Sequence, residues 1–408
     1  MASPTGATRR RRQLPSAAPV IRPRLLSLAV LATVALAGCS VGDDAGSPPQ
    51  LGASSDDEEA AAKLGFPTSA TKNTIRVSGG DAAADAAGVA SAVFPAVGPS
   101  TRPTAVVLAD SEDWQGAVAG SVLAASPIGA PILLSDGGDL PSASADTLER
   151  LKPKGSDLSK DAQVIRIGDK PPKPSGLKTA VIEGNDPYER AAAIDRFFSA
   201  AKGRPSNDVM VVSGERPDWA MPAAAWAARK GDSVLMARRD SLPDATRKAI
   251  EAHDKPNIFV IGSKAVLSEN VGKALSELGK VRRIEGPTPV QSAIAFARYD
   301  QGDFGWNVNV PGYNFTVAST TRPADAAAAA SLATRGVFAP LLVTNRADQL
   351  PKPLESYFLS VQPGYEEDPG EAVYNRAWIL GDDKVFSLPA QTRLDEITEL
   401  IPVQINAP

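Results

Sequence analysis

The chain has 408 residues, with 43 basic and 47 acidic side chains, a formal net charge of −4, one cysteine and one histidine. One cysteine excludes a disulfide framework, and one histidine with one cysteine leaves too few ligands for a zinc site. The acidic balance argues against nucleic-acid binding, which depends on clustered positive charge. We therefore expect no metal, no cofactor and no nucleic-acid partner.

The N-terminus has the pattern of a secretory signal. Arginines at positions 9–12, 22 and 24 precede an apolar run, residues 25–37, that is too short for a stable membrane span. The run ends in Leu36-Ala37-Gly38-Cys39, which resembles the bacterial lipobox and implies a lipid on Cys39. An ordinary signal peptide with an incidental cysteine is the alternative. The arginine run leaves the export route, Sec or twin-arginine, open.

Removal of residues 1–38 makes the mature chain more acidic. All six arginines before Cys39 leave and no acidic residue does, so 37 basic residues face 47 acidic ones, a balance of −10. Adhesion to anionic lipid through a polybasic face is therefore not expected. Residues 39–72 are rich in Gly, Ser, Pro and Ala with an acidic run at 56–59, and this composition predicts a solvated tether.

One apolar stretch recurs three times in the rest of the chain. Ala-Pro-Ile-Leu-Leu at 130–134 returns as Asp-Ser-Val-Leu-Met at 232–236 and as Ala-Pro-Leu-Leu-Val at 339–343. An Ala-rich segment precedes each copy, and a Leu-Pro pair and a second apolar run ending in glycine follow it. The glycines are Gly168, Gly262 and Gly381. Three cassettes of about a hundred residues each explain this order.

Each cassette alternates short β-branched runs with Ala-rich stretches, which predicts βαβ units and a parallel sheet covered on both faces. In the second copy we expect strands at 179–182, 209–212, 233–236 and 258–261, and helices at 188–201, 219–229, 244–252 and 265–278. Pro131 and Pro340 are expected at the first strand position, where a missing N–H costs little.

The three copies are not equal. The first lacks the closing helix, because residues 169–176 read Asp-Lys-Pro-Pro-Lys-Pro-Ser-Gly and cannot be helical. The third carries insertions at 301–314 and 362–375. These insertions are expected on surface loops, either as binding elements or as tolerated loop drift.

The order of strand, polar loop with aspartate, Ala-rich helix, Ala-Pro-Ile-Leu-Leu, Leu-Pro, strand and glycine resembles the cell wall-binding repeat 2 family. That family occurs as three tandem copies in surface proteins of Gram-positive bacteria. Of its repeat start, only parts are present: Arg-Val-Ser-Gly-Gly-Asp at 76–81, Asp-Pro-Tyr-Glu-Arg-Ala at 186–191 and Arg-Ile-Glu-Gly at 283–286, where the third copy has lost the tyrosine. The resemblance implies three Rossmann-like or Toprim-like α/β repeats, 73–177, 178–280 and 281–402, packed pseudo-threefold. It also implies non-covalent binding of an anionic glycan or teichoic-acid-like polymer.

Ligands of parallel sheets bind beyond the carboxyl ends of the strands. The loops there end in Asp113, Asp218 and Asp325, each just before an Ala-rich helix. We expect these aspartates mainly to cap the helices, with contact to sugar hydroxyls as the alternative. Trp114 and Trp219 follow two of them; burial under a neighbouring helix is favoured over stacking on a sugar.

Three arginines, Arg238, Arg239 and Arg346, directly follow apolar strands. They are forked donors that suit phosphate or carboxylate, and ordinary surface salt bridges are the alternative. Gly262-Ser263-Lys264 lacks the rest of a P-loop and implies no nucleotide. His253 is predicted in an exposed stretch, which argues against a Ser-His-Asp site. Paired carboxylates for glycoside hydrolysis stay open.

We therefore predict an extracytoplasmic, lipid-anchored binding protein that faces the cell wall and is not an enzyme. Its partners are a cell-wall polymer and, through the lipid on Cys39, the membrane. A substrate-binding lipoprotein of a transporter, with two lobes and one deep cleft, is the leading alternative. A glycan-processing enzyme is the third.

Overall fold

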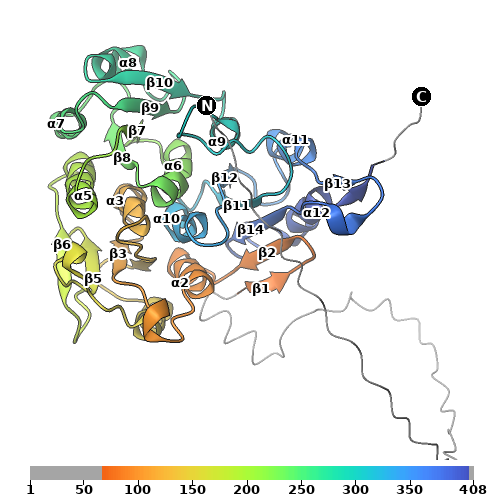
Figure 1. Cartoon of the computed structure of the whole chain (residues 1–408), viewed down its shortest axis with the longest axis horizontal. Coiled ribbons are helices and arrows are strands. Elements are labelled where there is room, and N and C mark those ends of the chain that lie inside the picture. Colours follow the sequence, from red (N-terminus) through yellow and green to blue (C-terminus); the bar gives the residue numbers. More distant parts are fainter. Residues whose placement is uncertain (1–66, 404–408) are drawn as a thin grey trace, which may run out of the picture. The chain divides into compact units, whose positions relative to one another are not determined.

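The computed structural model describes residues 67–403, so the predicted signal, Cys39 and most of the predicted tether lie outside the described part (Figure 1). Three sheets of parallel strands, flanked by helices, make up the described chain, which confirms the predicted α/β class. The first sheet has the order β4-β3-β5-β6. Its strands are β3 (Val106–Asp110), β4 (Ile132–Ser135), β5 (Val164–Ile167) and β6 (Thr179–Ile182).

The other two main sheets repeat this order. The second is β8-β7-β9-β10, and the third is β12-β11-β14-β2 with β1 added antiparallel to β2. Their strands are β7 (Asp208–Ser213), β8 (Ser233–Ala237), β9 (Asn257–Ile261), β10 (Lys280–Ile284), β11 (Asn314–Ser319), β12 (Leu341–Thr344), β14 (Arg376–Leu380), β2 (Thr74–Val77) and β1 (Pro67–Ala70). A small parallel pair, β13 (Gly364–Tyr365) and β15 (Ile401–Pro402), lies apart from them.

Each main sheet is completed by a strand from the following cassette. The register pairs Ile165 with Ala180 in the first sheet and Val260 with Arg283 in the second. In the third sheet Ile379 pairs with Arg76, so the first cassette's opening strand closes the third sheet. The three sheets thus form a closed cycle of strand exchange. The boundaries 73–177, 178–280 and 281–402 remain our proposal for the sequence repeat.

Three Ala-rich helices lie at the centre of this arrangement: α3 (Trp114–Gly120), α6 (Pro217–Lys230) and α10 (Asp325–Ala330). Each contacts the other two, as Figure 1 shows. Alanine and glycine dominate these contacts, and all five alanines of α10 are buried. Small side chains let helix axes approach closely, so the Ala-rich composition follows from burial on every side.

The other helices pack around this centre. They are α2 (Ala82–Val93), α4 (Ser142–Leu151), α5 (Pro187–Lys202), α7 (Asp244–Glu251), α8 (Glu269–Ser276), α9 (Pro289–Arg298), α11 (Lys352–Ser360) and α12 (Leu388–Thr398). α2, α5 and α9 occupy equivalent places, because each packs against one central helix and one edge strand, as α2 does on α10 and β4. This threefold repetition of contacts agrees with the predicted packing.

Two sets of glycines explain the repeated sequence signals. Gly168, Gly262 and Gly381 end the apolar runs with φ of 78°, 126° and 101°, a left-handed conformation that glycine adopts without strain. Gly79 and Gly184 stand where the opening strand meets the next helix. A Cβ there would lie 2.1 Å from Ala84 Cβ and 2.3 Å from the backbone nitrogen of Arg190, so the close approach requires glycine.

Several local expectations need correction. The helix predicted over residues 265–278 is shorter, because residues 263–267 form a turn before Ser268. Pro131 and Pro340 lie one residue before β4 and β12 rather than within them. The first cassette does lack a helix between β5 and β6, as predicted. In the first insertion of the third cassette, Phe304 is buried and stacks on Phe259, which gives that residue a packing role.

Candidate functional site

The carboxyl ends of the central strands β3, β7 and β11 are built alike. Asp110, Ser213 and Ser319 end these strands, and each side chain accepts a hydrogen bond from the backbone N–H two residues later, at 3.1 to 3.3 Å. This bond turns the chain sharply before the central helix. Each sheet therefore presents a short polar loop at the edge where a parallel sheet places ligands.

The three predicted aspartates have different partners. Asp113 caps α3 by accepting from Gly116 N at 3.1 Å, and its other oxygen binds Arg190 Nη1 of α5 at 2.6 Å. Asp218 is not a cap, because Pro217 starts α6 one residue earlier, and it pairs with Arg216 at 2.7 Å. Asp325 is not a cap either; it is the first residue of α10 and fully buried. The capping prediction is thus confirmed once and wrong twice.

The two tryptophans also differ. Trp219 is 4% exposed, and its indole Nε1 has no hydrogen-bond partner among the described residues. Burial, the favoured expectation, is therefore confirmed for Trp219. Trp114 is half-buried and lines a surface cavity, so its ring is accessible from one side.

Arg238, Arg239 and Arg346 lie at the carboxyl ends of β8 and β12 with side chains 54%, 65% and 47% exposed. Arg238 approaches Glu215 at 3.8 Å and lies over the ring of Tyr188. Arg346 forms a two-pronged pair with Asp348 at 3.1 and 2.8 Å. These arginines occupy two different sheets, and each has an acidic neighbour in the free protein.

A cavity of about 580 Å³ lies where the first and third cassettes meet. Its lining comes from the N-terminus of α2, the loop after β3 and the loop after β11, and includes Asp81, Glu112, Trp114, Thr321 and Arg322. Of the candidate polymer-binding residues named from the sequence, only Trp114 lines it, although the loops after β3 and β11 are the strand-end loops expected to meet a ligand. The cavity is therefore a polar hollow at the strand ends, in which Trp114 lies together with Asp81, Glu112, Thr321 and Arg322.

Arg322 binds two buried carboxylates beside this cavity. Its Nη2 lies 2.9 Å from Asp325 Oδ1 and also contacts Asp85 Oδ2, while Asp85 Oδ1 accepts from Gly79 N at 2.8 Å. Burial raises the pKa of Asp325 to about 8 and that of Asp85 to about 6, and the charge of Arg322 opposes both rises. One cation cannot neutralise two buried carboxylates, so the group retains a proton near neutral pH.

The prediction that His253 is exposed is wrong. His253 is 7% exposed, and its Nε2 and Nδ1 lie 3.0 Å from Asp195 Oδ1 and 2.8 Å from Ser206 O. Ser233 Oγ donates to the same Asp195 oxygen at 2.6 Å. The serine therefore bonds to the aspartate and not to the histidine, which is the reverse of the order that activates a nucleophile.

Residues 67–403 contain neither a membrane-spanning helix nor a cluster of metal ligands. No helix in this range is both long and apolar enough to span a bilayer. The same residues contain no group of three or more His, Cys, Asp or Glu side chains that could hold a metal ion.

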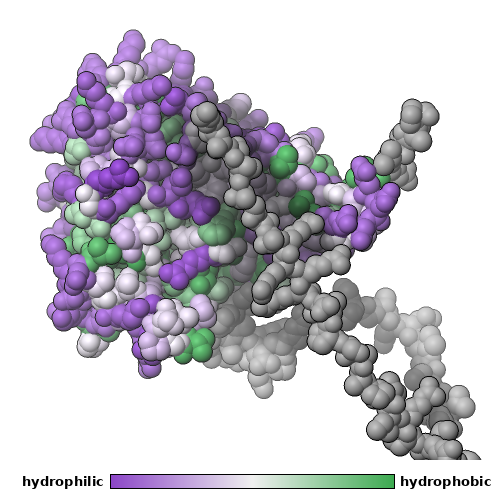
Figure 2. All heavy atoms as spheres, viewed as in Figure 1, coloured by the Kyte–Doolittle hydropathy of each residue, from purple (hydrophilic) through white to green (hydrophobic). Residues whose placement is uncertain are grey.

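Figure 2 shows how polarity is distributed over one face. Strongly hydrophilic residues dominate around α7, α8 and β10, whereas paler and apolar residues are interspersed near β3 and β6. Exposed Val181 in β6 belongs to the second kind. This face is thus not uniformly charged.

Residues 181–272 match the family described as Cell wall binding domain 2 (CWB2). Among solved structures the chain is similar to Cwp6 from Clostridium difficile, at 18% identity and a TM-score of 0.64 over 82% of this chain and 49% of that one. It is also similar to Cwp8 from Clostridium difficile, at 20% identity and a TM-score of 0.60 over 80% of this chain and 52% of that one.

The chain therefore spans about half the length of these two structures, and at such identities the likeness concerns the fold. Comparison with curated proteins gives no match. The matched segment runs from β6 to α8 and contains the second copy of the repeated apolar stretch, which confirms the resemblance found in the sequence. Residues 181–272 are thus similar to cell wall binding domain 2 (CWB2), and the fold of the chain is similar to that of Cwp6 and Cwp8 from Clostridium difficile.

Proposed function

We propose that this chain is a cell-wall-associated, extracytoplasmic surface protein that holds a wall polymer non-covalently. The observation that carries the proposal is the CWB2 match over residues 181–272 within a cycle of three like sheets. Three similar sites along one polymer gain avidity of about 10²–10⁴ without new contacts, because the second contact becomes intramolecular. Repetition of a scaffold therefore suits polymer binding.

We propose that the polymer is anionic, a glycan or a teichoic-acid-like chain. Support comes from Arg238, Arg239 and Arg346, which are exposed at strand ends and carry forked donors. Their acidic neighbours do not forbid this role. An exposed ion pair contributes only about 0–1 kcal/mol, so a polymer phosphate or carboxylate can replace Glu215 or Asp348 at little cost.

The loop residues Asp113, Trp114, Asp218, Trp219 and Asp325 contribute unequally to this proposal. Trp114 is half-buried and lines the cavity, where its ring suits stacking on a sugar ring. Trp219 and Asp325 are buried, so we assign them to positioning the loops.

Anchoring of the chain through a lipid on Cys39 is part of the proposal and rests on the sequence Leu36-Ala37-Gly38-Cys39. The change Cys39→Ala should move the chain from the detergent-extractable membrane fraction to the soluble fraction. Retention of the variant in the membrane fraction would remove the lipobox interpretation.

The transporter alternative requires two lobes around one deep cleft. The three central helices contact one another and each sheet borrows a strand from the next cassette, an arrangement that favours wall binding. A hydrolase with a Ser-His-Asp site is less well supported, because Ser233 is oriented toward Asp195 rather than His253.

Sedimentation of the full chain with purified cell walls tests the proposed function. We expect the chain to pellet with intact walls and to stay in solution when the secondary polymers have been extracted from the walls. Equal pelleting with both preparations would assign binding to peptidoglycan, and no pelleting with either would overturn wall binding.

A further inference from the structure

The first cassette contains a cavity on the side of its sheet where the other two cassettes carry a closing helix. In the second and third sheets a closing helix covers the outer face, α8 on β10 and α12 on β14 and β2. Val271 and Leu275 of α8, like Leu394 and Ile397 of α12, are at most 2% exposed. In the first sheet the Pro-rich residues 169–176 replace this helix, and a cavity of about 730 Å³ lies between them and α4.

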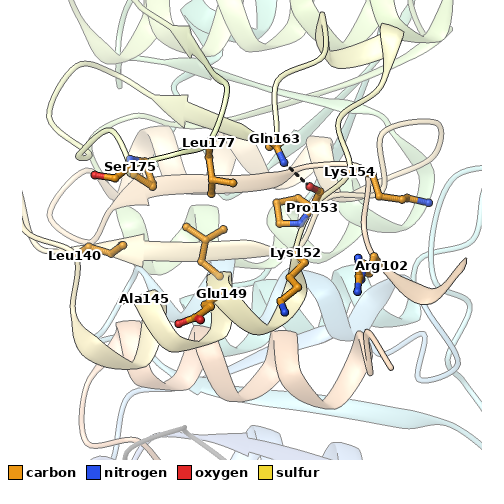
Figure 3. Close-up of a pocket in the computed structure, with 12 residues that line it drawn as sticks. Arg102, Leu140, Ala145, Glu149, Lys152, Pro153, Lys154, Gln163, Ser175 and Leu177 are labelled. Carbon is orange, nitrogen blue, oxygen red and sulfur yellow. Dashed lines mark hydrogen bonds between the residues drawn. The ribbon is translucent and has the colours of Figure 1, made fainter. Parts of the chain in front are cut away.

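The floor of this cavity is apolar. Leu148, which is 5% exposed, and Pro174 line it. Leu140, Pro153 and Leu177 line it as well (Figure 3). A volume of this size falls in the range of about 300–1,000 Å³ that small-molecule sites occupy. The cavity is therefore large enough to enclose an apolar ligand rather than only solvent.

Hydrogen bonds fix the walls. Gln163 Nε2 donates to Pro153 O at 2.8 Å, the bond drawn in Figure 3, and Gln163 Oε1 accepts from Lys178 N at 3.1 Å. The backbone N–H groups of Lys154 and Gly155 donate to Pro103 O and Thr104 O at 3.1 and 2.7 Å. A preformed wall lowers the entropic cost of binding.

Three cations, Arg102, Lys152 and Lys154, line the cavity together with one carboxylate, Glu149, which lies beside Lys152 and away from Arg102 and Lys154 (Figure 3). Among the described residues none of the three has an acidic partner within 4.0 Å, and Arg102 Nε is buried without a hydrogen-bond acceptor. By contrast, the half-buried Arg190 has Asp113 as its partner. A buried guanidinium N–H without an acceptor is costly, so an acceptor placed beside Arg102 Nε would be bound favourably.

We propose that this cavity binds a single-chain anionic lipid, an alkyl or isoprenyl chain that carries a phosphate. The chain lies against Leu140, Leu148 and Leu177, and the phosphate accepts charge-assisted hydrogen bonds from Arg102 and the two lysines. Free phosphate and a neutral lipid each match only one half of the cavity, the charged end or the apolar floor. A free phosphate leaves the apolar floor in water, and a neutral lipid leaves Arg102 without an acceptor.

Calorimetric titration of the full chain with dodecyl phosphate, below its micelle concentration, tests this proposal. We expect binding at least tenfold tighter than that of inorganic phosphate or of the neutral dodecyl maltoside. The double change Arg102→Gln with Lys154→Gln should weaken it at least tenfold. The control Lys248→Gln, an exposed cation on α7, should leave it unchanged.

A second variant tests the contribution of the apolar floor separately from that of the cations. Ala145→Phe on α4 places a ring in the cavity and should abolish binding while the melting temperature stays within error. Binding that survives Ala145→Phe, or that dodecyl maltoside matches, would overturn the proposal. Analytical ultracentrifugation gives a further test. A dimer that Ala145→Phe dissociates would also overturn the proposal, because a second copy of the chain would then occupy the cavity. Wall sedimentation does not depend on this cavity, so the two hypotheses fail independently.

Discussion

Val77 lies opposite Leu380 in adjacent parallel strands, although the two residues come from opposite ends of the described chain. The strand that contains Val77 is an integral part of the third sheet, and its Arg76 is 2% exposed. Arg76 donates to Gly381 O and Asp382 O at 2.9 Å each and to Gln391 Oε1 at 2.8 Å. The cycle of sheets is thus closed by buried hydrogen bonds as well as by strand pairing.

The change Arg76→Met should reduce the free energy of unfolding by about 1–3 kcal/mol, because it leaves buried acceptors without a donor. Urea denaturation should show a single transition shifted to lower urea, since the closing strand unfolds with the rest. Lys384→Met, an exposed cation in the loop after β14, is the control and should have little effect. An early separate transition with an unchanged main one would mean that closure is not cooperative.

Leu133→Ala or Leu341→Ala should each cost about 2–5 kcal/mol, because both residues lie in the recurring strands and are at most 1% exposed. Leu359→Ala on α11 removes the same atoms from a side chain 46% exposed and should cost far less. Thermal melts that do not separate the three variants would contradict burial of the strands.

The Asp325 carboxyl should make stability fall as the pH rises. Its folded pKa of about 8 lies above the ordinary value of 3.8, so the folded chain binds more protons between about pH 4 and pH 8. Asp325→Asn removes this titration while Arg322 keeps Asp85 as its partner, so the melting temperature should decline less from pH 5 to pH 8.5. Asp240→Asn, on an exposed loop, should leave the decline as it is. If the melting temperatures of the unchanged chain, Asp325→Asn and Asp240→Asn decline in parallel with pH, the carboxyl of Asp325 does not hold a buried proton.

His253 gives a second pH effect of the same sign. Burial lowers its pKa, but the hydrogen bond and charge of Asp195 outweigh burial and raise the pKa above its ordinary 6.5. This stabilisation is complete below about pH 6.5 and is lost as the pH rises through the raised pKa. His253→Gln should therefore be most destabilising near pH 6 and least above the folded pKa, as measured by urea midpoints. A deficit independent of pH would indicate packing alone.

The strands and the α/β class could be predicted because Ala-Pro-Ile-Leu-Leu and its relatives are apolar without alternation, as buried parallel strands are. The sheet to which each strand belongs could not be predicted, because nothing local in residues 179–182 indicates that this strand joins the first sheet. His253 was misplaced since its partner Asp195 is distant in sequence. Asp85 did leave a signal: a single charge among the alanines of α2, at the position that Arg190 holds in α5.

Retention of the full chain on purified walls, measured against salt concentration, tests the central claim most directly. If exposed arginines at the strand ends bind an anionic polymer, replacing Arg238, Arg239 and Arg346 by glutamine should weaken retention and flatten its salt dependence. The matched triple change of Lys248, Lys273 and Lys384 to glutamine removes the same charge elsewhere and should do neither. Retention that ignores salt and is unchanged by the three arginine substitutions would contradict the account.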